Sequence, residues 1–64
     1  MIPDRDIWRA ANLLIRKHGA DAELVAVRRA DEMLERGDHE GRVVWLRIRR
    51  AIVELQAVPA GKPN

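Results

Sequence analysis

Hydrophobic residues recur along most of the chain about three or four positions apart, which is the spacing of amphipathic helices. Basic residues followed by glycine, at Lys17-His18-Gly19 and at Arg36-Gly37, have the composition of helix ends. Pro59 ends the last segment, because proline disfavours helical backbone at the residue before it. The pattern therefore predicts an all-α fold with helices at about residues 4–18, 20–36 and 38–58, packed as a small bundle.

Acidic residues stand at the starts of the predicted helices and glycines at their ends. Asp4 or Asp6 can cap the first helix by accepting a backbone N–H, and Asp38 can do the same for the third. Gly19 and Gly37 follow the ends of the first and second helices, where the backbone often adopts a positive φ. We therefore expect a positive φ at both glycines.

Each predicted helix has an apolar face at about 100° per residue. On the second helix this face includes Ala22, Ala26 and Ala30, a row of small residues that allows a neighbouring helix to approach closely. Trp8 or Trp45 would supply bulk against that row. The sequence predicts a core of Trp8, Ala11, Leu14, Val27, Ala30, Leu34, Trp45, Ile48, Ile52 and Leu55.

The third helix carries more apolar residues than one core face needs. Its second, narrower stripe consists of Val43, Leu46, Val53 and Ala57. The arginines that flank this stripe are Arg42, Arg47, Arg49 and Arg50. A central helix that meets two partners explains part of the excess, and the remainder indicates a subunit contact. We expect one domain over residues 1–58 and a flexible tail over 59–64.

The amino-acid composition excludes several kinds of catalytic and metal-binding site. The 64 residues carry a formal charge of +2 and include no Cys, Ser, Thr, Tyr or Phe, which removes Ser- and Cys-based nucleophiles, disulfides and thiolate zinc sites. His18 and His39 lie at opposite ends of the predicted second helix, roughly 25 Å apart, so one chain cannot bring both to a single metal. We expect no enzyme activity, no cofactor, no metal and no small-molecule substrate.

The arginines of the third helix allow a second interpretation, because arginine contacts phosphates and guanine edges well. Apolar residues interrupt this basic group, and no Asn, Ser, Thr or Lys joins it. Opposite charges on the second and third helices could instead orient their packing. No segment has the length of a membrane span or the pattern of a signal peptide, so we expect a cytoplasmic protein without membrane contact.

Several short motifs resemble those of a known group of proteins. They are Ile7-Trp8-Arg9-Ala10-Ala11, His18-Gly19-Ala20, the run Gly37-Asp38-x-x-Gly41-x-x-x-Trp45, and Ala51-Ile52. In this order they resemble a family of short, mostly alphaproteobacterial proteins of uncharacterised function. The resemblance implies a small all-helical bacterial protein and implies no activity or binding residues.

These observations predict a small non-enzymatic protein-interaction or regulatory module. It would act through its helix surfaces, either by self-association, for example as a homodimer, or by docking on a larger protein. The alternative is a nucleic-acid-binding accessory protein that uses the arginines of the third helix.

Overall fold

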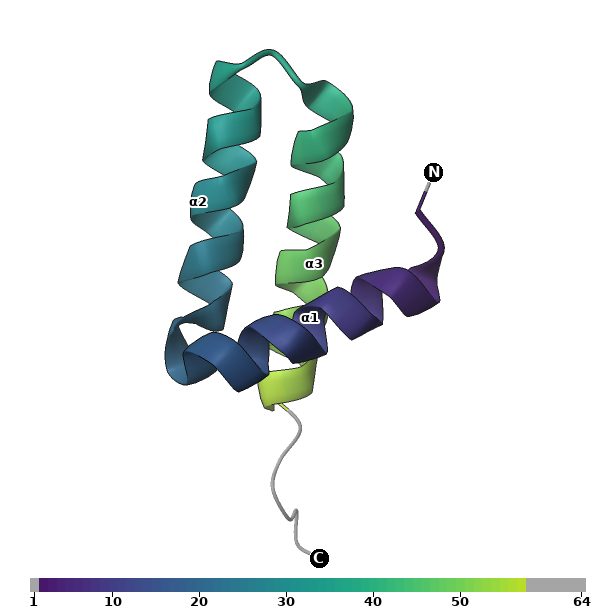
Figure 1. Cartoon of the computed structure of the whole chain (residues 1–64), viewed down its shortest axis with the longest axis vertical. Helices are drawn as coiled ribbons and strands as arrows, with labels where there is room; N and C mark the ends of the chain where they lie inside the picture. The colour runs from purple at the N-terminus through teal and green to yellow at the C-terminus, as the bar shows by residue number, and fades with distance from the viewer. Residues whose placement is uncertain (1, 58–64) are drawn as a thin grey trace, which may run out of the picture.

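Two antiparallel helices stand side by side, and a third crosses them near one end (Figure 1). This computed structural model describes residues 2–57. The elements are α1 (Asp4–His18), the 3-10 turn η1 (Gly19–Asp21), α2 (Ala22–Glu35) and α3 (His39–Ala57). The described part of the chain contains no strand, so the predicted all-α fold is confirmed. No helix in this part is long and apolar enough to cross a membrane.

The predicted helix boundaries are nearly those observed, with differences at three ends. The first helix has the predicted bounds. The second begins at Ala22 because residues 19–21 form the tighter turn η1, and it ends at Glu35. The third spans His39–Ala57. The predicted end at residue 58 and the predicted tail at 59–64 lie outside the described residues.

A glycine turn joins α2 to α3. Gly37 has a φ of 75°, and Gly19, at the end of α1, has a φ of 57°, so both predicted positive angles are confirmed. The Gly37 N–H donates to Leu34 O at 3.0 Å and the Asp38 N–H to Met33 O at 2.8 Å, the two bonds of a Schellman helix end. The turn therefore satisfies the last carbonyls of α2 before the chain reverses.

Helix capping follows the prediction at α3 and departs from it at α1. Asp38 Oδ1 accepts the Gly41 N–H at 2.9 Å, as a capping carboxylate does. A Cβ at Gly41 would lie 2.6 Å from Asp38 Oδ2, so the close carboxylate favours glycine there. At α1 the cap is Pro3, whose carbonyl accepts the Asp6 and Ile7 N–H groups at 3.0 and 3.2 Å. The predicted Asp4 or Asp6 cap is thus wrong.

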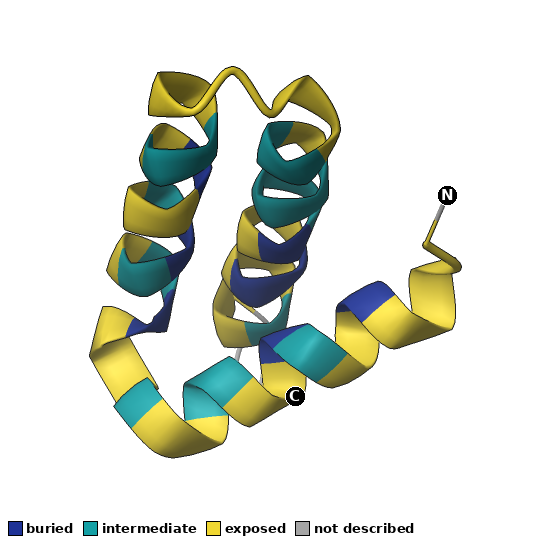
Figure 2. Ribbon diagram, turned by 45° about the horizontal axis from the view of Figure 1, so that its top comes forward, coloured by how far each residue is buried: buried dark blue, intermediate teal, exposed yellow. Residues whose placement is uncertain are grey.

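The core lies where all three helices meet (Figure 2). Its large buried side chains are Ile7 from α1 and Ile48 and Ile52 from α3. Alanines supply the other buried positions, namely Ala11, Ala22, Ala26, Ala30 and Ala51. The predicted alanine row of α2 is buried as expected. Of the two tryptophans predicted to pack there, Trp45 is half-buried against the core and Trp8 does not belong to it.

The predicted core is partly wrong in its membership. Trp8 is 38% exposed and Leu34 is 49% exposed, so neither belongs to the core. The half-buried members of the predicted set are Leu14, Val27, Trp45 and Leu55. In Figure 1, α1 crosses the hairpin at the end opposite the α2–α3 turn, and Leu34 lies next to that turn. The part of α2 and α3 next to their connecting turn is not covered by α1, which leaves Leu34 exposed to solvent.

Candidate interaction surface

The predicted second stripe of α3 lies on the outward side of that helix. Val43 is 50% exposed, Val53 is 38% exposed and Ala57 is exposed, whereas Leu46 is half-buried. At 100° per residue the four side chains fall within an arc of about 80°. The same arc includes the exposed Arg50, so the structure places these residues on one outward side of α3 with a charge among them, and Leu46 is half-buried.

The N-terminal segment extends this stripe. Ile2, Val43 and Val44 line a shallow groove beside the first turns of α3, with Arg47 at its margin. Ile2 is itself exposed. Sequence analysis missed this residue because it precedes the first helix, where helical periodicity gives no information about position. The apolar surface at the N-terminal half of α3 thus has contributions from two segments of the chain.

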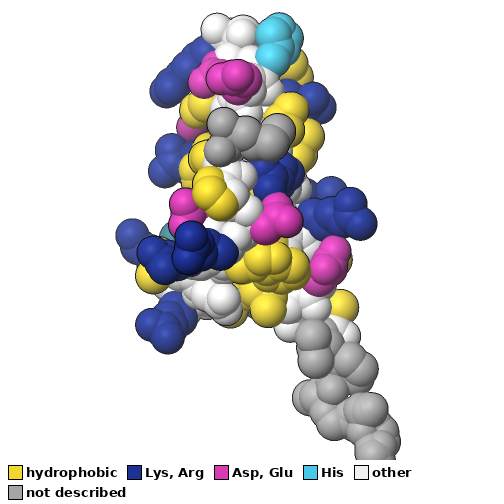
Figure 3. Space-filling view, turned by 90° about the vertical axis from the view of Figure 1, so that its right-hand side faces the viewer, with side chains coloured by type: hydrophobic (Ala, Val, Ile, Leu, Met, Phe, Trp, Pro, Cys, Tyr) yellow, Lys and Arg dark blue, Asp and Glu magenta, His cyan; other side chains and the backbone are white. Residues whose placement is uncertain are grey.

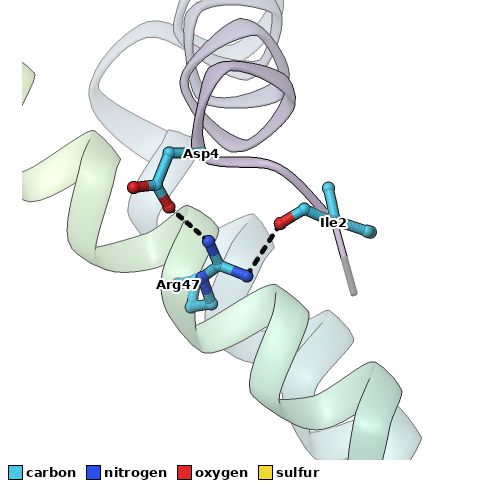
Figure 4. Close-up of polar contacts among 3 residues, drawn as sticks. All are labelled: Ile2, Asp4 and Arg47. Atoms are coloured by element: carbon cyan, nitrogen blue, oxygen red, sulfur yellow. Dashed lines mark hydrogen bonds and ion pairs between the residues drawn. The ribbon is translucent and has the colours of Figure 1, made fainter.

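The side chain of Arg47, on α3, contacts the start of α1 (Figure 4). Its guanidinium donates to the carbonyl oxygen of Ile2 at 3.0 Å and to the carboxylate of Asp4. The Arg47 side chain is 28% exposed and that of Asp4 is 86% exposed. An ion pair open to water contributes about 0–1 kcal/mol, so this contact adds little to the free energy of unfolding.

Two further arginines of α3 are also engaged in ion pairs. Arg49 Nη2 lies 3.0 Å from Glu23 Oε2, which joins α3 to α2. Arg50 Nε lies 3.2 Å from Glu54 Oε2, one turn along α3. The pair between Arg49 and Glu23 has the arrangement expected if opposite charges orient the two helices.

These pairs bear on the nucleic-acid interpretation of α3. Among its four candidate arginines, Arg42 alone makes no ion pair with a described residue. A phosphate contact by the other three would compete with a carboxylate already in place. Three of the four arginines of the nucleic-acid interpretation thus already have a carboxylate neighbour, and Arg42 has none among the described residues.

The histidines occupy separate places. His18 is half-buried at the last position of α1, and His39 is exposed at the first position of α3. Within residues 2–57, no group of three His, Cys, Asp or Glu side chains has the arrangement to hold a metal ion. The depressions found over this part of the surface are shallow and open to solvent.

Comparison of the chain with protein-family models, curated proteins and solved structures found no significant match. The resemblance to short alphaproteobacterial helical proteins stays a prediction.

Proposed function

We propose that this protein is a small non-enzymatic interaction module that self-associates through the outward stripe of α3. The observation that carries this proposal is that more of the large apolar side chains are exposed than are buried. Among the described residues, Ile7, Ile48 and Ile52 are the only large apolar side chains that are buried. The large apolar side chains that remain more than a third exposed are Ile2, Trp8, Leu13, Leu24, Leu34, Val43 and Val53.

Chain length explains why this imbalance matters. A domain of about 60 residues buries only about 60% of the surface that its unfolded chain exposes. Small domains commonly make up the deficit with disulfides, metals or oligomerisation. This sequence has no cysteine, and alanine provides little apolar area at most of its buried positions. Association with a second copy would supply the missing burial.

The stripe of α3 suits a contact between identical subunits. Val43 and Val53 lie ten positions apart, or about 15 Å along the helix, with Leu46 between them. In a two-fold contact each copy contributes the same patch, so an apolar stripe pairs with itself without needing opposite charges. A standard interface covers about 800 Å² on each partner, roughly a sixth of the 4793 Å² surface of this chain.

Other parts of the proposal rest on composition. Without Ser, Thr, Cys or Tyr, the chain offers few groups for covalent catalysis, which favours a binding role. A cysteine-free chain also fits the reducing cytoplasm, the compartment we propose. Docking on a larger protein through the same stripe is the competing form of this function.

Sedimentation equilibrium of the parent protein and of Val53→Glu tests the proposal. We expect the parent to be dimeric at high concentration and Val53→Glu to be monomeric with unchanged helicity, because the new charge would lie in the apolar contact. Leu13→Glu is the matched control, since Leu13 is 57% exposed on α1, away from the stripe. A parent that stays monomeric, or a control that dissociates as readily as Val53→Glu, would refute self-association through α3.

A further inference from the structure

The outward face of α1 carries a row of arginines that take no part in the ion pairs of the described residues. Arg5, Arg9 and Arg16 are exposed, and none of them forms an ion pair with a described residue. At 100° per residue, these arginines and Asn12 fall within an arc of about 60°. The row extends for about 16 Å along the helix. Figure 3 shows basic side chains gathered over α1, at the lower left of the view.

The acidic residues of α1 do not neutralise this row. Asp4 pairs with Arg47 on the side of α1 that meets α3. Asp6 lies about 60° around the helix from Arg9, the nearest of the three arginines by angle, and forms no ion pair with any of them. The row therefore presents three positive charges to solvent with no carboxylate between them.

The position of α1 makes this face accessible. Nine of its 15 residues are exposed, and α1 lies obliquely across α3 rather than between the other helices (Figure 1). An α-helix with its side chains is about 10–12 Å across. The major groove of B-DNA is about 12 Å wide and admits such a helix, whereas the major groove of duplex RNA is too narrow for side chains to read.

We propose that the outward face of α1 binds double-stranded DNA, with Arg5, Arg9 and Arg16 contacting phosphates. Asn12 lies between Arg9 and Arg16 along the helix and at one edge of the row by angle, and an asparagine amide can pair with the edge of adenine. Asn12 Nδ2 donates one hydrogen bond to Trp8 O at 3.0 Å, which leaves its other N–H and its carbonyl oxygen for a base. This site is independent of the stripe on α3 and of whether the protein self-associates.

The distribution of apolar residues on α1 favours DNA over an anionic membrane. Trp8 and Leu13 lie on opposite edges of the arginine row, about 140° apart. A helix that lies in a membrane interface needs one continuous apolar face beside its charged face. The continuous apolar face of α1 consists of Ile7, Ala11, Leu14 and Ile15, which pack in or against the core and are therefore not available to lipids.

Fluorescence anisotropy with a labelled DNA duplex of about 20 base pairs tests this site. Three phosphate contacts give a slope of about −2.7 for log affinity against log salt, so affinity should fall about 40-fold between about 50 and 200 mM NaCl. The Arg5→Gln/Arg9→Gln/Arg16→Gln variant should lose this salt dependence and bind at least about 40-fold more weakly at the lower salt. Glutamine is a good helix former, so circular dichroism should show an unchanged fold.

Arg28→Gln/Arg36→Gln/Arg42→Gln is the matched control. It removes the same charge from exposed or half-buried arginines elsewhere, none of which makes an ion pair with a described residue. We expect the control to keep most of the affinity and the salt slope. Equal weakening in the two variants would overturn the site, as would a parent that fails to bind the duplex or that prefers vesicles of anionic phospholipid.

Discussion

Ile52→Ala should leave the protein largely unfolded at room temperature. Ile52 is the largest fully buried side chain in the described part of the chain and lies in the cluster where all three helices meet. Truncating a buried isoleucine to alanine typically costs about 2–5 kcal/mol, because transfer energy is lost and a cavity remains. A single core in a domain of fewer than about 70 residues rarely supplies more than about 3–5 kcal/mol of stability, so this loss removes most or all of it. Urea titration followed by far-ultraviolet circular dichroism measures the loss.

Leu34→Ala is the control for this prediction. The same titration should show a change of less than about 1 kcal/mol, because a half-exposed leucine loses little transfer energy and leaves no enclosed cavity. If both variants melt like the parent, the cluster around Ile52 is not the core. If Leu34→Ala is the more damaging variant, the apolar face of α2 is turned differently from the arrangement described above.

Ala26→Leu should destabilise the protein by about 1–3 kcal/mol even though it adds apolar volume. Ala26 has no exposed surface, and its neighbours in the core include Ile48 and Ile52 of α3. The hairpin reaches its close helix packing because α2 presents alanines there. A leucine at this position would displace α3 from α2. The displacement would cost more packing contacts than the added side chain could form.

Ala20→Leu provides the comparison, since Ala20 is exposed in η1. Thermal melting should show a clear fall for Ala26→Leu and little change for Ala20→Leu. A melting temperature for Ala26→Leu at or above that of the parent would show that α2 and α3 have free space between them, contrary to the close packing inferred from the buried alanines.

The sequence predicts the helices well because their limits depend on local chemistry. Glycine after basic residues marks the ends of α1 and α2, and the capping residue Asp38 marks the start of α3. The predicted cap of α1 is wrong because the helix begins one residue after Pro3, so the N-cap position holds a proline, which has no side-chain acceptor. Two aspartates close to a helix start do not by themselves show which residue occupies the N-cap position.

Burial was harder to predict because it depends on where the third helix crosses. Periodicity assigned Trp8 and Leu34 to apolar faces, but it gives no information about the width of the covered zone. The pattern of α3 alone predicts that this helix has more apolar residues than one core face needs. The ion-pair partners of Arg47 and Arg49 lie on other helices, so the sequence does not predict them. Periodicity alone places the arginines of α1 on one face, whereas only the structure shows that they form no ion pair with a described residue.

The central claim is that a core too thin for one chain is completed by a second copy. The most direct test is the melting temperature of the parent protein over a roughly hundredfold range of concentration. Self-association predicts that the melting temperature rises by about 5–10 °C across this range, because mass action favours the folded dimer. Val53→Glu should melt at one temperature throughout. A parent whose melting temperature does not change with concentration would contradict the claim.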